Sequence, residues 1–524
     1  MDSGDKPTSE PTRREIMTTA GAAGIVAGVD ALASRSRAES AKPPHVVIIG
    51  AGLAGLCAAL KLQEKKWTYT ILEAERNHVG GRVRTMPIGN GLHWEAGAMR
   101  IPHNHDITLR YVKEFPELQT RTFVMNNEKA FFFARGRKER VKDEDKIRRL
   151  FDLSPEERDQ SSDALWKLSV HGPRDRLTPE EKEELKSANA FSYETLQRLD
   201  RLSLRQLIEQ ARLPNADRAK DGALLSEEAI EYLLFAFGNL TLQHGASTEF
   251  LREELNGVWD PPFFEIIGGT RGLPDAFLRR LTNKPRMGCE VVRLERDSSG
   301  NRVKAIYRRG GAVSYEEGDY LICTVPFPVL SRIEVDPPFS DHKQRAILEM
   351  GYDSATKVIF LTKNRFWELN DGIYGGSSTT DLMTGPIYYP SDNAEEKNPR
   401  VSNGPGVLLA SYTWGQDARR LGSMTATQRQ EIAFSQIKKV HPELAQPGMV
   451  LDRATWTWDS YPWAGGAFAF YLPGQFARIH RHVIAPEGRI YFAGEHCSHS
   501  HSWMQGALES GERAVEALTA RQGS

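Results

Sequence analysis

The clearest hydrophobic pattern in the chain lies in residues 45–73. An apolar run, Val46 to Ile49, leads into a glycine-rich turn, and small apolar residues then recur with helical spacing. A second apolar run, Tyr69 to Leu72, ends at the acidic Glu73. Short apolar runs on either side of a helical segment are typical of the β-α-β unit of a parallel sheet. The pattern therefore predicts a strand, a helix and a second, parallel strand.

The turn between the first strand and the helix reads GAGLAG and contains Gly50, Gly52 and Gly55. The first glycine permits the tight turn, the second lets backbone approach a pyrophosphate, and the third packs helix on strand. The helix N-terminus then offers unpaired N–H groups and the positive end of its dipole to the phosphates. Glu73 stands where a carboxylate accepts hydrogen bonds from a ribose 2′-hydroxyl and repels a 2′-phosphate. The turn predicts a dinucleotide site.

Beyond this unit the chain alternates between helical and strand patterns. Residues 106–260 are charged and helical in pattern, without a strand signal of note, and residues 331–470 contain strands with aromatic alternation. We expect an α/β fold with a Rossmann-like domain, a mixed-sheet substrate domain and an inserted helical domain. The expected divisions are a leader and linker at 1–44, nucleotide-binding parts at 45–105, 261–330 and 471–524, a helical insertion at 106–260 and a substrate-binding domain at 331–470.

The first 44 residues do not belong to this fold. A polar start leads through Arg13 and Arg14 to an Ala/Gly-rich, weakly apolar segment ending at Ala33. The string resembles a twin-arginine export signal, which carries folded, cofactor-loaded proteins. The other interpretation is a disordered Ala/Gly tail, since Asp30 interrupts the apolar stretch. Export predicts a periplasmic or secreted protein, and the tail a cytoplasmic one.

Composition narrows the class of protein further. The 524 residues are enough for two intertwined domains with a large core, and 68 basic residues nearly balance 69 acidic ones. This balance argues against a nucleic-acid partner, and no apolar run of about 18 residues predicts a membrane anchor. The cysteines lack metal-ligand spacing, and we expect buried thiols rather than disulfides. They are Cys57, Cys289, Cys323 and Cys497.

Two further motifs indicate which dinucleotide is bound. After Glu73 the sequence reads AERNHVGGRVRT, so Gly80, Gly81 and Arg82 follow in one short loop. Residues 489–517 read RIYFAGEHCSHSHSWMQGALESGERAVEA. Together with the first glycine turn, these motifs resemble the FAD-dependent amine oxidase family, and in particular bacterial-type L-amino-acid oxidases. The resemblance covers roughly residues 45–520.

The resemblance implies a tightly held FAD. Val291 matches the position whose backbone meets the adenine, Glu495 would bind ribityl or diphosphate atoms, and the helix beginning near Met504 would face flavin N1/O2. Monoamine oxidases carry a flavin-bonded cysteine where this chain has Ala467, so non-covalent FAD is expected. The implied contacts are Gly50, Gly52, Ala54, Gly55, Glu73, Ala74, Gly81, Arg82, Gly97, Ala98, Met99, Val291, Gly494, Glu495 and Met504.

Arg100, in the stretch GLHWEAGAMRIP, has two interpretations. In the first, it forms a structural salt bridge. In the second, its planar guanidinium binds a substrate carboxylate through two parallel hydrogen bonds, which a lysine ammonium cannot form. The MRxP context resembles L-amino-acid oxidases, in which this arginine holds the α-carboxylate. Tyr412 matches the position at which those enzymes carry a tyrosine that binds the carboxylate together with the arginine, and Trp414 lies on the same strand face. Alternatively, Tyr412 and Trp414 belong to a strand that packs in an aromatic core.

Lys357 matches the family lysine that holds a water against flavin N5. Asp353 lies four residues earlier, on the same face of a regular strand. It either pairs with Lys357 or faces the pocket and meets a cationic substrate tail.

The C-terminal segments complete the implied site. Phe468 and Trp503 match the aromatic pair that flanks the amine, and Trp456 matches another pocket aromatic. His496, His499 and His501 suggest a metal cluster by composition, but the family places flavin there, so no metal is expected. The implied catalytic residues are Arg100, Lys357, Tyr412 and Trp503, and the implied pocket residues are Asp353, Trp414, Trp456, Ala467, Phe468 and Ser502.

The resemblance thus implies an L-amino-acid oxidase that makes a 2-oxo acid, ammonia and hydrogen peroxide from an L-amino acid and oxygen. Trp414, the small Ala467 and Asp353 favour a long basic side chain, that of L-arginine or L-lysine. An amine or polyamine oxidase, an L-amino-acid 2-monooxygenase and a flavin protein without turnover remain open. Because many relatives self-associate, a homo-oligomer is expected.

Overall fold

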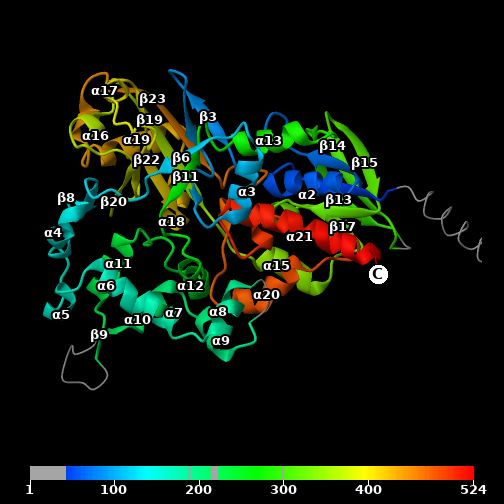
Figure 1. Cartoon of the computed structure of the whole chain (residues 1–524), viewed down its shortest axis with the longest axis horizontal. Coiled ribbons are helices and arrows are strands. Elements are labelled where there is room, and N and C mark those ends of the chain that lie inside the picture. The colour runs from blue at the N-terminus through cyan, green and yellow to red at the C-terminus, as the bar shows by residue number, and fades with distance from the viewer. Residues whose placement is uncertain (1–42, 188–190, 214–221, 298–299, 524) are drawn as a thin grey trace, which may run out of the picture. The chain divides into compact units, whose positions relative to one another are not determined.

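The computed structural model describes residues 43–187, 191–213, 222–297 and 300–523. Contacts divide the chain into a unit of residues 1–44 and a larger unit that begins at His45. Residues 1–42, including the twin-arginine-like Arg13 and Arg14, lie outside the described residues. All helices and strands of the described residues belong to the larger unit (Figure 1).

The glycine turn lies at the carboxyl end of the central strand of a parallel sheet. This strand pairs in parallel with a neighbour on each side and is buried almost throughout, as a parallel strand covered on both faces must be. Helices α2 (Leu53–Glu64) and α21 (Met504–Gly523) lie side by side against this sheet (Figure 1). The predicted Rossmann-like fold is confirmed. Across the sheet the strands are β12 (Arg286–Met287), β2 (Thr68–Glu73), β1 (His45–Ile49), β16 (Tyr320–Cys323) and β25 (Ile490–Phe492).

A second sheet extends the nucleotide-binding region and carries Val291 in its strand β13. Its order is β15 (Ala312–Gly318), β14 (Val303–Arg309), β13 (Glu290–Arg296) and β17 (Glu334–Asp336). Apart from α2 and α21, the described helices outside residues 141–260 are α3 (Asp106–Glu114), α13 (Gly272–Arg280), α14 (Phe327–Leu330), α15 (Asp341–Glu349), α16 (Phe366–Leu369), α17 (Pro399–Asn403), α18 (Gly415–Gly422), α19 (Ala426–Ile437) and α20 (Gln475–Ile484).

The substrate-domain sheet has seven strands among the described residues. Its strand β19 is buried along its whole length and pairs antiparallel with β22 and β23. The order is β23 (Val450–Thr457), β19 (Ala355–Thr362), β22 (Gly406–Trp414), β21 (Ile387–Tyr389), β20 (Gly376–Thr380), β7 (Phe131–Ala134) and β8 (Arg137–Arg140). Smaller pairings join β3 (Thr85–Ile88) to β4 (Leu92–Glu95), and β18 (Tyr352–Asp353) to β24 (Phe468–Ala469).

Residues 106–260 differ from the prediction that this block lacks strands. β7 and β8 belong to the substrate-domain sheet, and β6 (Thr120–Phe123) pairs with β11 (Phe263–Ile266), which also pairs with β5 (Ile101–Pro102). β6, β7 and β8 escape sequence analysis because each spans only four residues among charged neighbours, and because β6 and β7 also pair with strands far along the chain.

The helical part of the insertion begins after β8. Capping boxes at Ser154 with Glu157 and at Thr178 with Glu181 start two of its helices, at the positions where the sequence predicts caps. Figure 1 shows these helices gathered together, in cyan and green. They are α4 (Glu144–Arg148), α5 (Pro155–Arg158), α6 (Ser162–Trp166), α7 (Gly172–Asp175), α8 (Pro179–Lys186), α9 (Glu194–Asp200), α10 (Leu204–Glu209), α11 (Glu227–Ala236) and α12 (Ser247–Leu255), with the short strands β9 (Arg212–Leu213) and β10 (Ala223–Leu224).

The cysteines Cys57, Cys289, Cys323 and Cys497 are buried and free, as the sequence predicts. Burial raises the pKa of Cys57, Cys323 and Cys497 to about 12, so these thiols stay protonated at neutral pH. None of the helices in the described part of the chain has the length and apolar character to cross a membrane.

Candidate active site

One continuous cavity of about 880 Å³ runs from the glycine turn to the helical insertion. Nearly all the residues that the resemblance assigns to FAD line it; Gly55 does not. Those that do are Gly50, Gly52, Ala54, Glu73, Ala74, Gly81, Arg82, Gly97, Ala98, Met99, Val291, Gly494, Glu495 and Met504.

The glycine turn forms a cradle that side chains would fill. Gly50 adopts a φ of +99°, which favours glycine, and a Cβ on Gly55 would lie 2.0 Å from the Gly50 carbonyl oxygen. A Cβ on Gly52 would meet no atom within 4 Å, because Gly52 borders the cavity. Gly52 therefore leaves room for a ligand, whereas Gly55 lets the helix pack on the strand.

Glu73 lies at the end of β2, where it borders the cavity. Its carboxylate accepts hydrogen bonds from the backbone N–H of Ala51 at 2.6 Å and of Glu75 at 2.8 Å. Burial raises the pKa of Glu73 above its usual value. The side chain is thus fixed beside the glycine turn, in a position that suits the ribose of a dinucleotide.

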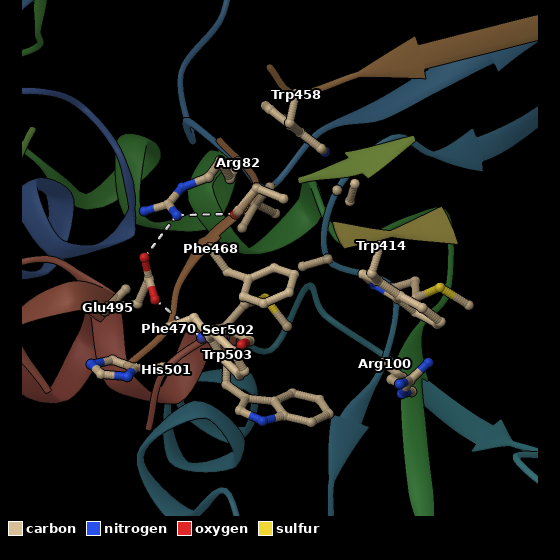
Figure 2. Close-up of a pocket in the computed structure, with 18 of the residues that line it drawn as sticks. Arg82, Arg100, Trp414, Trp458, Phe468, Phe470, Glu495, His501, Ser502 and Trp503 are labelled. Carbon is tan, nitrogen blue, oxygen red and sulfur yellow. Dashed lines mark hydrogen bonds and ion pairs between the residues drawn. The ribbon is translucent and has the colours of Figure 1, made fainter. Parts of the chain in front are cut away.

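Arg82 and Glu495 bind each other rather than standing free beside the cavity (Figure 2). Arg82 Nη1 donates to Glu495 Oε1 at 2.7 Å and to the carbonyl of Ala467 at 3.0 Å. Glu495 also accepts from the backbone N–H of Ser502 at 3.1 Å. Burial alone would raise the pKa of Glu495, but Arg82 holds it below its usual value. In this structure the Glu495 side chain joins the segments around Ala467 and Ser502, and its expected contact with ribityl or diphosphate atoms stays a prediction.

Arg100 borders the cavity, and no hydrogen bond or ion pair joins its guanidinium to another described residue. Its Nε and Nη1 are buried but donate no hydrogen bond to any described residue. Three aromatic rings surround the guanidinium, whose Cζ lies 5.4 Å from the Trp259 ring, 5.7 Å from Trp503 and 5.8 Å from Tyr388. In the view of Figure 2, Trp503 and Phe468 lie between Arg100 and the Arg82–Glu495 pair. The salt-bridge interpretation of Arg100 does not fit this arrangement.

Tyr412 and Trp414 both border the cavity, from the last residues of β22. Their ring centroids are 4.3 Å apart, and Tyr412 also lies 6.1 Å from the ring of Tyr388. Tyr388 in turn contacts Arg100, so the phenols and the guanidinium form one wall. Sequence analysis missed Tyr388 and Trp259, because neither lies in one of the short motifs from which the site residues were assigned.

Lys357 does not reach the cavity surface. Its Nζ donates to the carbonyls of Glu95 at 2.9 Å and Gly97 at 2.7 Å, and it lies 4.4 Å from the centre of the Tyr412 ring. Burial lowers the pKa of Lys357. The observed contacts fasten the backbone that leads to Arg100, and the expected hold on a water at flavin N5 stays a prediction.

Asp353 lies outside the cavity lining, contrary to both interpretations of it. Its Oδ1 accepts from Arg419 at 3.2 Å and from the backbone N–H of Ser354 at 2.8 Å. Ser354 separates β18 from β19, so Asp353 does not continue the strand that carries Lys357. Burial raises the pKa of Asp353 to about 6. Asp353 therefore neither pairs with Lys357 nor offers a charge to the cavity.

Trp456, predicted to face the pocket, also lies outside the cavity lining. It lies behind the cavity wall, where its ring packs 5.5 Å from Trp458 and 4.9 Å from the Arg84 guanidinium. Trp458, two residues later on the chain, lines the cavity instead.

The C-terminal segments supply the remaining predicted residues. Ala467, Phe468, Ser502 and Trp503 all border the cavity, as does Phe470, which sequence analysis missed. Helix α21 begins at Met504, so its N-terminal N–H groups face the cavity as expected of a site for an anionic flavin edge.

The helical insertion contributes carboxylates that sequence analysis did not single out. Glu249, Glu253 and Glu254 of α12 all line the cavity. Glu249 pairs with His501 at 2.8 Å and Glu254 with His171 at 2.7 Å. No three His, Cys, Asp or Glu side chains in the described ranges come together in a way that would hold a metal ion.

Comparison with known proteins agrees with this geometry. Residues 53–519 match the family described as flavin containing amine oxidoreductase, so the chain belongs to that family of oxidoreductases. A protein provisionally named the L-amino-acid oxidase YobN, from Bacillus subtilis (strain 168), is 31% identical, and the match covers 91% of this chain and 95% of YobN. The L-amino-acid oxidase of Vipera ammodytes ammodytes is 30% identical over 91% of this chain and 93% of its own. Among solved structures, a putrescine oxidase variant matches with a TM-score of 0.69 at 19% identity, over 91% of this chain and 99% of that one, which shows the shared fold.

Proposed function

We propose that this protein is an FAD-dependent L-amino-acid oxidase. The observation that carries the proposal is the half-buried guanidinium of Arg100 in the cavity wall, whose Nε and Nη1 are buried and form no hydrogen bond with any described residue. A buried cation is costly unless a ligand neutralises it, and a planar guanidinium matches a carboxylate in two parallel hydrogen bonds. The names of the relatives in Bacillus and Vipera support the same assignment.

The side chains around Arg100 suit an α-amino acid. The guanidinium would bind the α-carboxylate, with the Tyr412 hydroxyl as the second contact. Trp503 and Phe468 would confine the amine and the Cα–H, and this positioning accounts for most of the catalysis by the protein itself. When bound, the flavin supplies the hydride acceptor and returns the electrons to oxygen.

We propose that the flavin is FAD and that it is bound without a covalent link. The cradle at Gly52, the fixed carboxylate of Glu73 and the N-terminus of α21 fit an extended dinucleotide. Ala467 borders the cavity and has no thiol, and Cys289 borders it beside Glu73, at the nucleotide end. Acid precipitation of the holoprotein should therefore leave all the flavin in the supernatant; flavin retained in the pellet would contradict this.

Two other activities of the same family compete with the proposal. An amine or polyamine oxidase would give Arg100 no carboxylate to bind, although the fold likeness to putrescine oxidase keeps this candidate in view. An L-amino-acid 2-monooxygenase would use the same contacts but yield an amide and carbon dioxide.

Product analysis separates these activities. We expect aerobic incubation with L-amino acids to release 2-oxo acid, ammonia and hydrogen peroxide in equal amounts. An amide product would identify the monooxygenase instead, and turnover of simple amines alone would identify an amine oxidase. We further propose export by the leader and self-association; periplasmic fractionation and light scattering test these two points.

A further inference from the structure

Glu253 contacts the same two indoles as Arg100, but at their N–H edges rather than over their rings. Its Oε1 accepts from the indole N–H of Trp503 and its Oε2 from that of Trp259, each at 2.9 Å. These are two of the three rings that surround Arg100. A cation over the rings and a carboxylate at the N–H edges thus share the two indoles, with no ion pair between them.

Glu253 differs from its neighbours on helix α12 in lacking a cation. Glu249 pairs with Arg252 and His501, and Glu254 pairs with His171, whereas Glu253 forms no ion pair within the described residues. Burial and the like charges of Glu249 and Glu254 raise the pKa of Glu253. A cation bound beside Glu253 would offset both the burial of its carboxylate and the repulsion from Glu249 and Glu254.

The rest of this end of the cavity is acidic as well. Among the described residues, Lys167 is the one lysine or arginine that the insertion contributes to the lining, against several carboxylates. A cavity wall with one sign of charge attracts the opposite charge. The lining acids of residues 141–260 are Glu144, Asp163, Glu249, Glu253, Glu254 and Asp260.

We infer that Glu253 binds the positively charged end of a basic L-amino acid, such as the guanidinium of L-arginine or the ammonium of L-lysine. With the α-carboxylate on Arg100, the side chain would run past the faces of Trp259 and Trp503 to reach the carboxylate of Glu253. Indole faces also attract cations. This inference rests on the proposed function, and it assigns to Glu253 the task that the sequence assigned to Asp353.

The test compares charged substrates with neutral ones of the same shape. The pairs are L-arginine with L-citrulline and L-lysine with L-norleucine, and the measured quantity is kcat/KM for peroxide release. We expect the wild-type enzyme to favour the charged member of each pair by at least about tenfold. Glu253→Gln should lose that preference because its kcat/KM falls for the charged substrates and not for the neutral ones. Glu253→Asp, which keeps the charge, should retain part of it.

Glu254→Gln is the matched control, because Glu254 also borders the cavity but is already paired with His171. It should keep the wild-type ratio within about twofold. Equal losses on charged and neutral substrates in Glu253→Gln would mean that Glu253 only holds the two indoles, which overturns the inference. A wild-type enzyme that favours neutral L-amino acids also overturns it while leaving the proposed function intact. If no L-amino acid is oxidised, the proposed function itself fails.

Discussion

At the scale of single residues, the main feature of the site is the uncompensated charge of Arg100. The side chain is half-buried among aromatic rings, and its buried Nε and Nη1 have no hydrogen-bond acceptor in the described residues. Leaving a charge in this state is costly, and a bound carboxylate removes that cost. The side chain is therefore prepared for an anionic ligand, which explains how the pocket would discriminate between amino acids and simple amines.

Substitution of Arg100 should show this directly. Arg100→Lys keeps the positive charge but loses the planar fork, and Arg100→Ala loses both. Losing one partner of a buried charge pair costs about 2–5 kcal/mol, so we expect kcat/KM for the best L-amino acid to fall at least about 30-fold in each variant. Flavin content, read from the visible spectrum, should not change. An unchanged kcat/KM would contradict the carboxylate clamp.

The residues differ in how far the sequence predicts them. Arg100 and Trp503 belong to recognisable motifs and both border the cavity. Glu253 gave no signal, because its meaning depends on Trp503, which is 250 residues away along the chain. Asp353 was misplaced, since the break at Ser354 turns its carboxylate toward Arg419. Motifs thus predict site residues that are recognisable from their local sequence, and they miss residues whose role depends on tertiary packing.

At the scale of elements, the β1–turn–α2 unit assigns different tasks to neighbouring glycines. Gly52 has ordinary backbone angles and faces open space, whereas Gly55 touches the Gly50 carbonyl. The unit is predictable because both of its strands are continuous apolar runs. The four-residue strands β7 and β8 are not predictable in this way, because the four charged residues of β8 are as typical of a helix surface as of a strand.

Substitutions at these two glycines should therefore separate flavin binding from folding. Gly52→Val should give a folded protein whose melting temperature matches that of the flavin-free wild type, but without bound flavin, because the side chain fills the cradle. Gly55→Val should instead reduce the yield of folded protein, because its Cβ collides with backbone. Circular dichroism and the flavin-to-protein absorbance ratio measure both effects. Stoichiometric flavin in Gly52→Val would exclude this location for the pyrophosphate.

At the scale of the whole molecule, several buried histidines link stability to pH. Burial lowers the pKa of His105, His441, His496 and His499 to about 3. Between that value and the usual 6.5, the unfolded chain binds protons that the folded chain does not. These groups therefore make the folded state less stable as the pH falls below about 6.5.

His441 allows a test far from the candidate site. It is fully buried, and its Nε2 lies 2.6 Å from the Tyr389 hydroxyl. We expect His441→Gln to gain stability relative to wild type by up to about 2 kcal/mol between pH 7 and pH 5. Denaturant unfolding at the two pH values measures this. Tyr389→Phe, which removes the hydrogen bond but keeps the histidine, should follow the wild-type pH dependence; a gain of the same size there would contradict the explanation.

The most direct test of the proposed function is anaerobic reduction of the bound flavin by matched pairs of compounds. Each pair is an L-amino acid and the amine left when its carboxylate is removed: L-arginine with agmatine, and L-leucine with isopentylamine. Because Arg100 is proposed to bind the carboxylate, at least one amino acid should bleach the flavin absorbance within seconds to minutes, and neither amine should do so. Bleaching by an amine as fast as by its parent amino acid, or by no member of either pair, would contradict the assignment.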